Sequence, residues 1–449
     1  MPLLNPFLYG KPVPPPRFVG RREAVRTLFS RLNNGESTAI VGEPHIGKSS
    51  LLRYIVDDDV RAQWLGNAPF TCFFTEIDCH MLPRSFTPTD FWRQALTSLS
   101  LAVPDEVVAR QWQVVVDNQF GSFTLDSLFQ LLARSSRRVV LVIDEFDSLL
   151  NHPNFNAEFF GALRSMATRT DGLAVITASR LSVAAMNRLS HELNPRGSPF
   201  FNNITEVRLL PLSLDEGRSL IEMTLADTGI AFTDDDYAFV HDLSSRHPFL
   251  MQIAAAGLFD AAVDGMTDEA RYQAGGKFFH DCAVAFFDDF WRHLPPTGQI
   301  AMMLLALGEM KGRVDGREFD TSDLGRIEWY EPELLHLQSL GMVERVDQRV
   351  GIAGLTLWQG ACWRVASRGF TWWAAGNVIA GTRDTVVFDQ WLRDKEYQGL
   401  LTREQADSLR NLGKSIPKSV ADSVAQMVKS LLGEVVKGWT GFNPTARNS

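Results

Sequence analysis

The stretch Gly42-Glu43-Pro44-His45-Ile46-Gly47-Lys48-Ser49 decides the fold of this 449-residue chain. It fits the pattern G-x-x-x-x-G-K-[ST] in full, in which glycines let backbone N–H groups turn toward phosphate oxygens. A β-rich run, residues 37–41, comes before the stretch, and residues 49–56 have helical spacing. The amino terminus of a helix favours negative charge. Strand, glycine-rich turn and helix therefore predict a nucleotide-binding loop that extends to Ser50.

This loop also assigns chemistry to two side chains. Lys48 would reach the β- and γ-phosphates, and the Ser49 hydroxyl would ligate Mg²⁺. The chain contains no N-K-x-D motif for reading guanine. We therefore expect ATP and ADP, with Mg²⁺, rather than GTP.

A second motif is the apolar run 139–143, which ends in Asp144 and Glu145. With a phosphate loop upstream, Asp144 is predicted to hold the Mg²⁺ shell and Glu145 to act as general base toward the attacking water. Acids at a strand end can also be solvent-facing turn residues. Asp147 is interpreted as a helix cap or a solvated residue.

Two further residues are candidates for contacts with the nucleotide. Arg180 follows the apolar run 172–179, at the edge of a parallel sheet where ligands bind, and could touch the γ-phosphate. The alternative is a surface salt-bridge residue. Pro248 opens a predicted helix, where proline is common for structural reasons, or it closes over the adenine.

Apolar runs that alternate with helical patterns predict a parallel sheet covered on both faces. The fold class is therefore α/β, with a P-loop ATPase core over residues 21–211 after an extended Pro- and Gly-rich lead-in, residues 1–20. The expected strands are residues 37–41, 70–78, 139–144, 172–179 and 204–209. The expected helices are residues 21–32, 49–56, 90–101, 125–134 and 155–168.

Beyond Pro211 the strand patterns stop, and residues 212–275 predict a small helical lid. Helical patterns at residues 284–293, 297–307 and 332–340, then short β-like pieces near 342–346 and 361–365, predict a winged-helix domain over 276–380. Residues 381–449 predict a polar helical tail. Its amphipathic stretch, 418–439, packs on its own domain, docks a partner or, least favoured, lies on a membrane.

Composition excludes several classes of protein. A hydrophobic fraction of 45% with 22% charged residues indicates a globular protein, and no run reaches the roughly 20 apolar residues that span a membrane. The first residues lack a signal-peptide layout, and the four cysteines lack metal-type pairing, so a cytoplasmic location is expected. A net charge of −9 argues against a large nucleic-acid surface but leaves a local patch open.

The chain resembles bacterial STAND-class ATPases, relatives of AAA+, NACHT and NB-ARC proteins, over residues 5 to about 370. The resemblance rests on Asn5-Pro6-Phe7, on Arg17-Phe18-Val19-Gly20-Arg21, and on the two motifs above. It continues through Ala178-Ser179-Arg180, residues 210–213 and residues 247–249.

The resemblance implies that Val19, Gly20 and Arg21 line the adenine pocket, that Arg180 is a sensor arginine, and that Pro248 lies under the base. It also implies a slow switch, closed with ADP and open and self-associated with ATP, in signalling or antiviral defence. The chain departs from the pattern because a Met-His-Asp triplet, an effector module and a sensor array are not recognisable. An effector or sensor acting in trans is therefore expected.

Three hypotheses stay open. The first is the nucleotide switch. The second is an AAA+ ATPase that acts on DNA through its winged helix, but residues 276–370 have 10 Lys and Arg against 13 Asp and Glu, without the basic excess of a DNA reader. The third is a scaffold that binds nucleotide without hydrolysing it, against which Lys48, Asp144 and Glu145 speak.

Overall fold

The computed structural model describes residues 3–66, 68–80, 82–102, 106–193, 201–309, 327–352, 355–374 and 407. It divides the chain into two compact units. The first, Lys11–Leu209, is called here the α/β unit. The second, called the helical unit, combines Met1–Gly10 with Leu210–Ser449. The chain therefore passes between the units at two places, Gly10–Lys11 and Leu209–Leu210.

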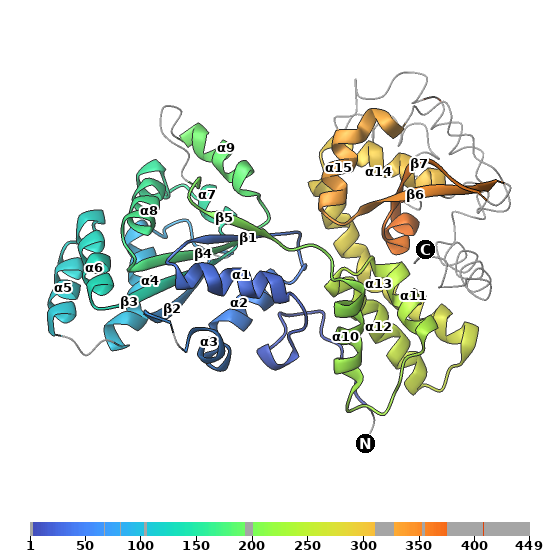
Figure 1. Ribbon diagram of the computed structural model, residues 1–449, viewed down its shortest axis with the longest axis horizontal. Helices are drawn as coiled ribbons and strands as arrows, with labels where there is room; N and C mark the ends of the chain where they lie inside the picture. Colours follow the sequence, from blue (N-terminus) through green and yellow to red (C-terminus); the bar gives the residue numbers. More distant parts are fainter. Residues whose placement is uncertain are drawn as a thin grey trace. The chain divides into compact units, whose positions relative to one another are not determined.

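The α/β unit is built on a five-stranded parallel sheet in the order β2-β3-β4-β1-β5 (Figure 1). Each strand that was predicted from the sequence is present, and the α/β prediction is confirmed. In the register, Val41 pairs with Ser179, and Asp78 with Asp144, so the strand ends meet at one edge. The strands are β1 (Thr38–Val41), β2 (Thr71–Asp78), β3 (Arg137–Asp144), β4 (Leu173–Ser179) and β5 (Thr205–Arg208).

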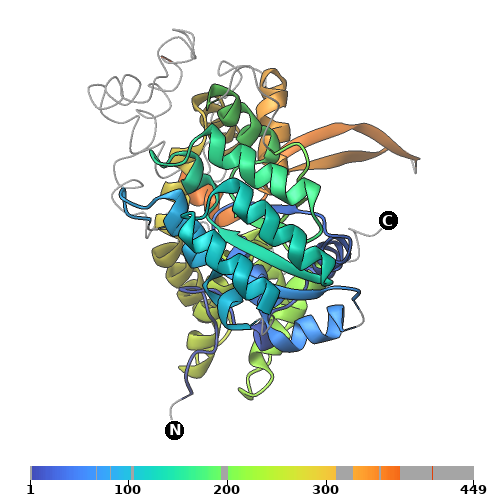
Figure 2. The same cartoon turned by 90° about the vertical axis from the view of Figure 1, so that its left-hand side faces the viewer.

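Helices cover both faces of the sheet, as Figure 2 shows from the side of this unit. Alternate residues of a strand point to opposite faces, so neighbouring positions of β3 enter different cores. Val140 and Val142 pack on one face with three helices, α1 (Arg22–Asn33), α2 (Lys48–Val56) and α3 (Asp58–Leu65). Leu141 and Ile143 pack on the other face with α4 (Pro88–Ala102), α6 (Ser122–Arg134) and α8 (Ala157–Arg169). Burial on both faces explains the nearly unbroken apolar character of β3 and β4.

Among its described residues, the α/β unit contains the helices that were predicted from the sequence and four more. The expected helices near 90–101, 125–134 and 155–168 are confirmed within a few residues. Those at α3, α5, α7 and α9 were not predicted. The helices are α1 (Arg22–Asn33), α2 (Lys48–Val56), α3 (Asp58–Leu65), α4 (Pro88–Ala102), α5 (Glu106–Asp117), α6 (Ser122–Arg134), α7 (Asp147–Leu150), α8 (Ala157–Arg169) and α9 (Val183–Leu193), with a 3-10 turn η1 (Pro15–Arg17).

The helical unit is arranged around α12, which is apolar on all sides and therefore buried along most of its length. Ser213 and Thr233 begin α10 and α11 with capping boxes, each bonded to an acid three residues later. The helix predicted to begin at residue 284 in fact begins at Asp268 and runs through the proposed boundary at 275. The helices are α10 (Leu214–Leu225), α11 (Asp234–Ser244), α12 (Pro248–Val263), α13 (Asp268–His293), α14 (Pro296–Glu309) and α15 (Glu331–Ser339), with η3 (Ile327–Tyr330).

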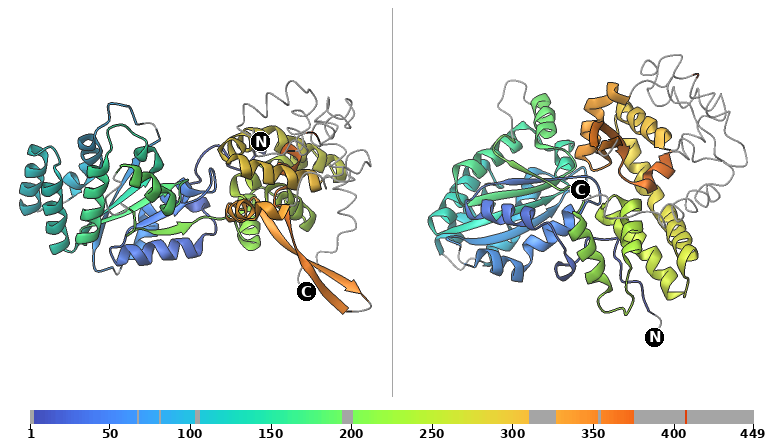
Figure 3. Two further views of the ribbon diagram at one scale, coloured as in Figure 1. Left: turned by 90° about the horizontal axis from the view of Figure 1, so that it is seen from above. Right: turned by 45° about the vertical axis from the view of Figure 1, so that its right-hand side comes forward.

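After α15 the chain forms an antiparallel hairpin of β6 (Val343–Ile352) and β7 (Leu355–Val365), which projects from the helical unit in Figure 3. The order of α14, α15 and this hairpin agrees with the expected winged helix, which stays a prediction. The predicted helical tail, residues 381–449, lies outside the described residues except for residue 407. Among the helices of the described ranges, none is both long and apolar enough to cross a membrane.

Candidate functional site

The predicted phosphate loop joins buried β1 to α2. Gly47 has φ 104°, a left-handed conformation that side chains rarely adopt, and a Cβ there would meet open space. Gly42 is constrained differently, because a Cβ there would lie 2.8 Å from Ile46 Cγ2 and 3.0 Å from the Leu209 carbonyl oxygen. Ile46 is anchored in the core. Gly47 therefore permits the left-handed turn of the loop, and Gly42 permits close packing of the loop against Ile46 and Leu209.

Lys48 is the first residue of α2, and its side chain lies inside the loop. Only 5% of the residue is exposed, and its ammonium donates hydrogen bonds to the carbonyl oxygens of Gly42 (2.9 Å) and Glu43 (3.0 Å). Burial lowers the pKa of Lys48, and the carboxylates of Glu145 and Glu43 oppose this. The loop thus presents a cation and a helix amino terminus, the donor set that a polyphosphate requires.

The acidic end of β3 lies at the same edge of the sheet. Asp144 is the last residue of the strand, and its carboxylate accepts a hydrogen bond from the Glu145 backbone N–H (2.9 Å). Glu145 has φ 50°, in the left-handed region. The next backbone N–H, from Phe146, donates to the Ala178 carbonyl oxygen (2.9 Å). This short turn fixes the direction in which the Glu145 side chain leaves the strand.

Burial raises the pKa of Glu145, and the Lys48 ammonium opposes part of this rise. A carboxylate of raised pKa is a stronger base, which suits proton abstraction from water. Glu145 and Lys48 affect each other electrostatically, so the two predicted catalytic groups lie close to each other.

Arg180 comes directly after β4, which lies between β3 and β1 in the sheet. Its charge acts on both Lys48 and Glu145. Two main-chain hydrogen bonds connect β4 to the loops on either side. One is the bond from the Phe146 N–H to the Ala178 carbonyl oxygen, and the other runs from the Gly42 N–H to the Ser179 carbonyl oxygen (3.3 Å). The strand order therefore places the predicted sensor between the phosphate loop and the acidic turn.

Arg21 is in contact with the phosphate loop. It caps the amino terminus of α1 with φ 58°, and its guanidinium donates to the Ile46 carbonyl oxygen (3.1 Å). Val19 and Gly20 lead into this turn, and Gly20 also has a positive φ, 74°. These three residues belong to the same unit as the loop, and their role at the adenine stays a proposal.

The remaining loop residues have distinct surroundings. Ser49 is half-buried in the first turn of α2, and the neighbouring Ser50 hydroxyl accepts a hydrogen bond from the Val13 N–H (3.2 Å). Pro44 is half-buried, whereas His45 is exposed with φ 59°. A serine hydroxyl and the Asp144 carboxylate are hard oxygen donors of the kind that Mg²⁺ prefers, so the residues fit that ion.

Pro248 occupies the first turn of α12 in the helical unit. This position agrees with the structural explanation for the proline, because the first N–H groups of a helix have no hydrogen-bond partner within the helix and proline lacks that N–H. Its placement against a base stays a proposal.

Of the two interpretations of Asp147, a helix cap or a solvated residue, the first is wrong. Asp147 does not cap α7 but is the first residue within it, after Phe146, and its buried Oδ1 accepts no hydrogen bond from the described residues. The left-handed conformation of Glu145 and the main-chain hydrogen bonds to β4 were not predicted from the sequence. A non-glycine residue carries no local signal for a positive φ, so the sequence could not have predicted it.

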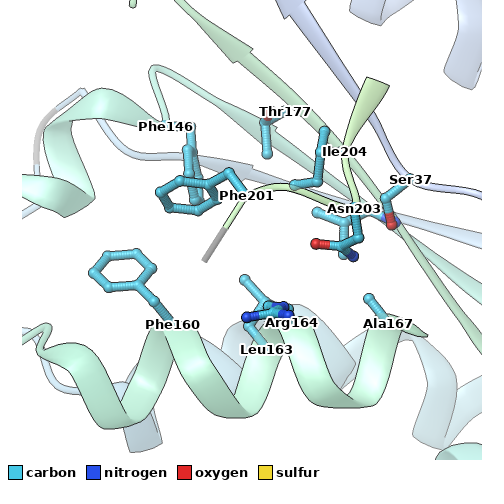
Figure 4. Close-up of a pocket in the computed structure, with 11 residues that line it drawn as sticks. Ser37, Phe146, Phe160, Leu163, Arg164, Ala167, Thr177, Phe201, Asn203 and Ile204 are labelled. Atoms are coloured by element: carbon cyan, nitrogen blue, oxygen red, sulfur yellow. The ribbon is translucent and has the colours of Figure 1, made fainter. Parts of the chain in front are cut away.

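Figure 4 shows a cavity between the sheet and α8, in which Phe146, Phe160 and Phe201 face Thr177 and Asn203. Its volume of about 10 Å³ is close to that of one water molecule and far below that of a nucleotide. The Thr177 hydroxyl and the Asn203 side-chain oxygen are buried without a partner among the described residues. This cavity is therefore a packing feature beneath the site rather than the site itself.

The comparison with protein families decides the class of this chain. The model for novel STAND NTPase 1 matches residues 12–327, which is more than half of the chain. The chain belongs to the nSTAND1 family. The predicted STAND relationship is thereby confirmed, and with it the assignment of the α/β unit to the P-loop NTPases. A comparison with curated proteins gives no match.

Solved structures with a similar fold have low sequence identity to this nSTAND1 chain. The Walker-type ATPase PABY2304 of Pyrococcus abyssi has 15% identity and a TM-score of 0.47, covering 80% of this chain and 96% of that one. The ORC2 protein of Aeropyrum pernix has 17% identity and a TM-score of 0.47, covering 80% and 92%. The RuvB branch-migration motor of Thermotoga maritima has 15% identity and a TM-score of 0.35, covering 73% and 90%. We draw no functional inference from these similarities.

Proposed function

We propose that this protein is an ATP-hydrolysing switch that is closed with ADP and self-associates with ATP. The observation that carries the proposal is the electrostatic proximity of Lys48, Glu145 and Arg180, which follow three different strands, β1, β3 and β4, of one sheet. The division of the chain into two units, joined at two places, supports a switch whose output is a change of conformation rather than a chemically altered substrate. We place its action in the cytoplasm, in bacterial signalling or antiviral defence, with an effector or sensor protein in trans.

The chain's own groups account for hydrolysis. Lys48 and the loop N–H groups bind the β- and γ-phosphates and neutralise charge as it develops. Glu145 accepts a proton from water while the water oxygen bonds to the γ-phosphorus. The bond from that phosphorus to the bridging oxygen breaks, and ADP leaves with the electron pair. Ser49 and Asp144 would hold Mg²⁺, which neutralises phosphate charge when bound.

Switching requires that the two states bind the γ-phosphate with different affinity, because a ligand shifts an equilibrium only by its differential affinity. Arg180 is suited to this role, since it is exposed at the strand end beside the charges of Lys48 and Glu145. We propose that it contacts the γ-phosphate in the ATP state alone. Pro248 and the Val19–Gly20–Arg21 turn are proposed to hold the adenine.

The test is mass photometry of the purified protein with ADP, with ATP, and with ATP on the Glu145→Gln variant. We expect a defined oligomer in the variant with ATP and a monomer with ADP. The Lys48→Ala variant is the control that should stay monomeric with ATP. A monomer in every sample, despite measured ATP binding, would refute the switch. A DNA-bound species formed with duplex DNA would instead favour the alternative, an AAA+ ATPase acting on DNA.

A further inference from the structure

The amino-terminal residues lie along one side of α12 in the helical unit. The Asn5 amide donates to the Ala256 carbonyl oxygen (3.0 Å) and to the Asp260 carboxylate (2.8 Å). The Leu8 N–H donates to the Gln252 side-chain oxygen (2.9 Å). Gln252, Ala256 and Asp260 are spaced four apart, so the segment follows one stripe of the helix.

Phe7 anchors this segment in the core of the helical unit. The residue is 5% exposed, and its ring lies 6.4 Å from that of Phe232 and 6.2 Å from that of Phe259. Tyr9 makes an edge contact with Phe278. Side chains and backbone together therefore fix residues 5–9 to the helical unit.

The next residues are fixed to a different helix, α2 of the α/β unit. The Val13 N–H donates to the Ser50 hydroxyl (3.2 Å), and the Arg53 guanidinium donates to the Pro12 carbonyl oxygen (3.4 Å). Phe18 stacks on Tyr54 with 4.5 Å between ring centroids. The three α2 residues are spaced as i, i+3 and i+4, which places them on one face of the helix.

Only a short stretch separates the two sets of anchors. Gly10 and Lys11 are exposed, and a Cβ on Gly10 would meet no atom within 4 Å. From Leu8 to Pro12 the chain can extend by at most about 14 Å, because a residue spans no more than roughly 3.6 Å. A displacement of α12 beyond that limit must pull on α2 or break one set of anchors.

We propose that residues 5–18 form a strap that transmits the position of α12 to α2, whose first turn holds Lys48 and Ser49. The strap acts through positioning and does not touch the reacting atoms. It deepens the proposed function, on which it rests, by giving a physical connection between the helical unit and the phosphate loop. The helices that it joins are also the ones that begin at Lys48 and at Pro248.

The experiment is a double-mutant cycle on the full chain. Phe7→Ala loosens the first anchor, and a four-residue Gly-Ser insertion between Gly10 and Lys11 leaves both anchors intact but lengthens the connection. A matched insertion after Gly229, in an exposed turn of the helical unit, controls for the added residues. Asn5→Ala repeats the cycle with a milder change in case Phe7→Ala does not fold.

Two readouts are measured on each variant: the affinity for a fluorescent ATP analogue, and hydrogen exchange of the α2 amides without nucleotide. We expect Phe7→Ala to change the affinity by roughly fivefold, the lower range of allosteric coupling, and to reduce α2 protection. Both effects should disappear in the presence of the linker insertion and persist with the Gly229 insertion.

Equal effects of Phe7→Ala with the native and the lengthened linker would overturn the strap, and so would no effect with the native linker. The exchange readout needs no nucleotide, so it separates this inference from the proposed function. Loss of α2 protection in a chain that binds no ATP would support the strap while refuting the switch.

Discussion

The left-handed conformation of Glu145 predicts an unusual order of stability among its variants. Glu145→Ala and Glu145→Gly both remove the carboxylate, so they differ only in how well the new residue adopts φ 50°. A residue with a Cβ costs roughly 1–2 kcal/mol in the left-handed region. Against this, a glycine lowers the free energy of unfolding by about 0.4–1 kcal/mol relative to an alanine, because it gives the unfolded chain more conformational freedom. The balance leaves Glu145→Gly more stable than Glu145→Ala by about 1 kcal/mol.

The assay is urea unfolding of both variants, followed by far-UV circular dichroism. With a urea slope of about 1–3 kcal/mol per molar, a difference near 1 kcal/mol shifts the midpoint by roughly 0.3–1 M. Gln113, an exposed residue in the middle of α5, provides the matched control. There the order should reverse, with the alanine variant more stable by about 1 kcal/mol, because glycine is unfavourable inside a helix.

If Glu145→Ala proves as stable as Glu145→Gly or more so, the left-handed turn is not a property of the folded protein. The direction of the Glu145 side chain would then not be set by this turn. Both variants should lose ATP hydrolysis in either case, since neither has a carboxylate to accept the proton of water.

Three more predictions follow from buried or shifted groups. Burial raises the pKa of Glu145, so the rate of ATP hydrolysis should fall as the pH drops through a value above the ordinary glutamate pKa of about 4.3. A hydrolysis rate that does not change with pH in this range would contradict the assignment of Glu145 as the base. Arg138 is 1% exposed, and its guanidinium donates to main-chain carbonyl oxygens that would lose their partner in Arg138→Met. This variant should destabilise the α/β unit by about 3 kcal/mol, and a loss below about 1 kcal/mol in urea unfolding would contradict the prediction. Gly172→Ala should impair folding, since a Cβ would lie 1.9 Å from the Phe129 carbonyl oxygen. Gly10→Ala, where a Cβ would meet no atom within 4 Å, is the control in the same melting experiment.

The sequence predicted the parts of the fold that depend on local pattern. The strands were recognisable because β3 and β4 are buried on both faces and carry unbroken apolar runs. The phosphate loop was recognisable because glycine and lysine spacing reflects its chemistry directly. Asp144 and Glu145 followed from their position after such a run.

Other parts depend on tertiary contacts that have no sequence signature. The helix α3 was not predicted, although the Asp57 side chain caps it by accepting hydrogen bonds from the Asp59 and Val60 N–H groups. The residues of α13 before 284 include two adjacent glycines, Gly275 and Gly276, which lower helical propensity, and packing on α12 overrides this. The division of residues 5–18 between two helices follows from the full fold alone.

The hydrogen bonds that join β4 to the loops on either side have a consequence for experiments that scan point mutations. The acceptors are the main-chain carbonyl oxygens of Ala178 and Ser179, so replacing either residue with one of similar size deletes neither bond. Substitutions at these two positions would therefore be tolerated, although the strand joins the two loops through these hydrogen bonds. A one-residue insertion in β4 would shift both acceptors out of register at once and reveal the connection.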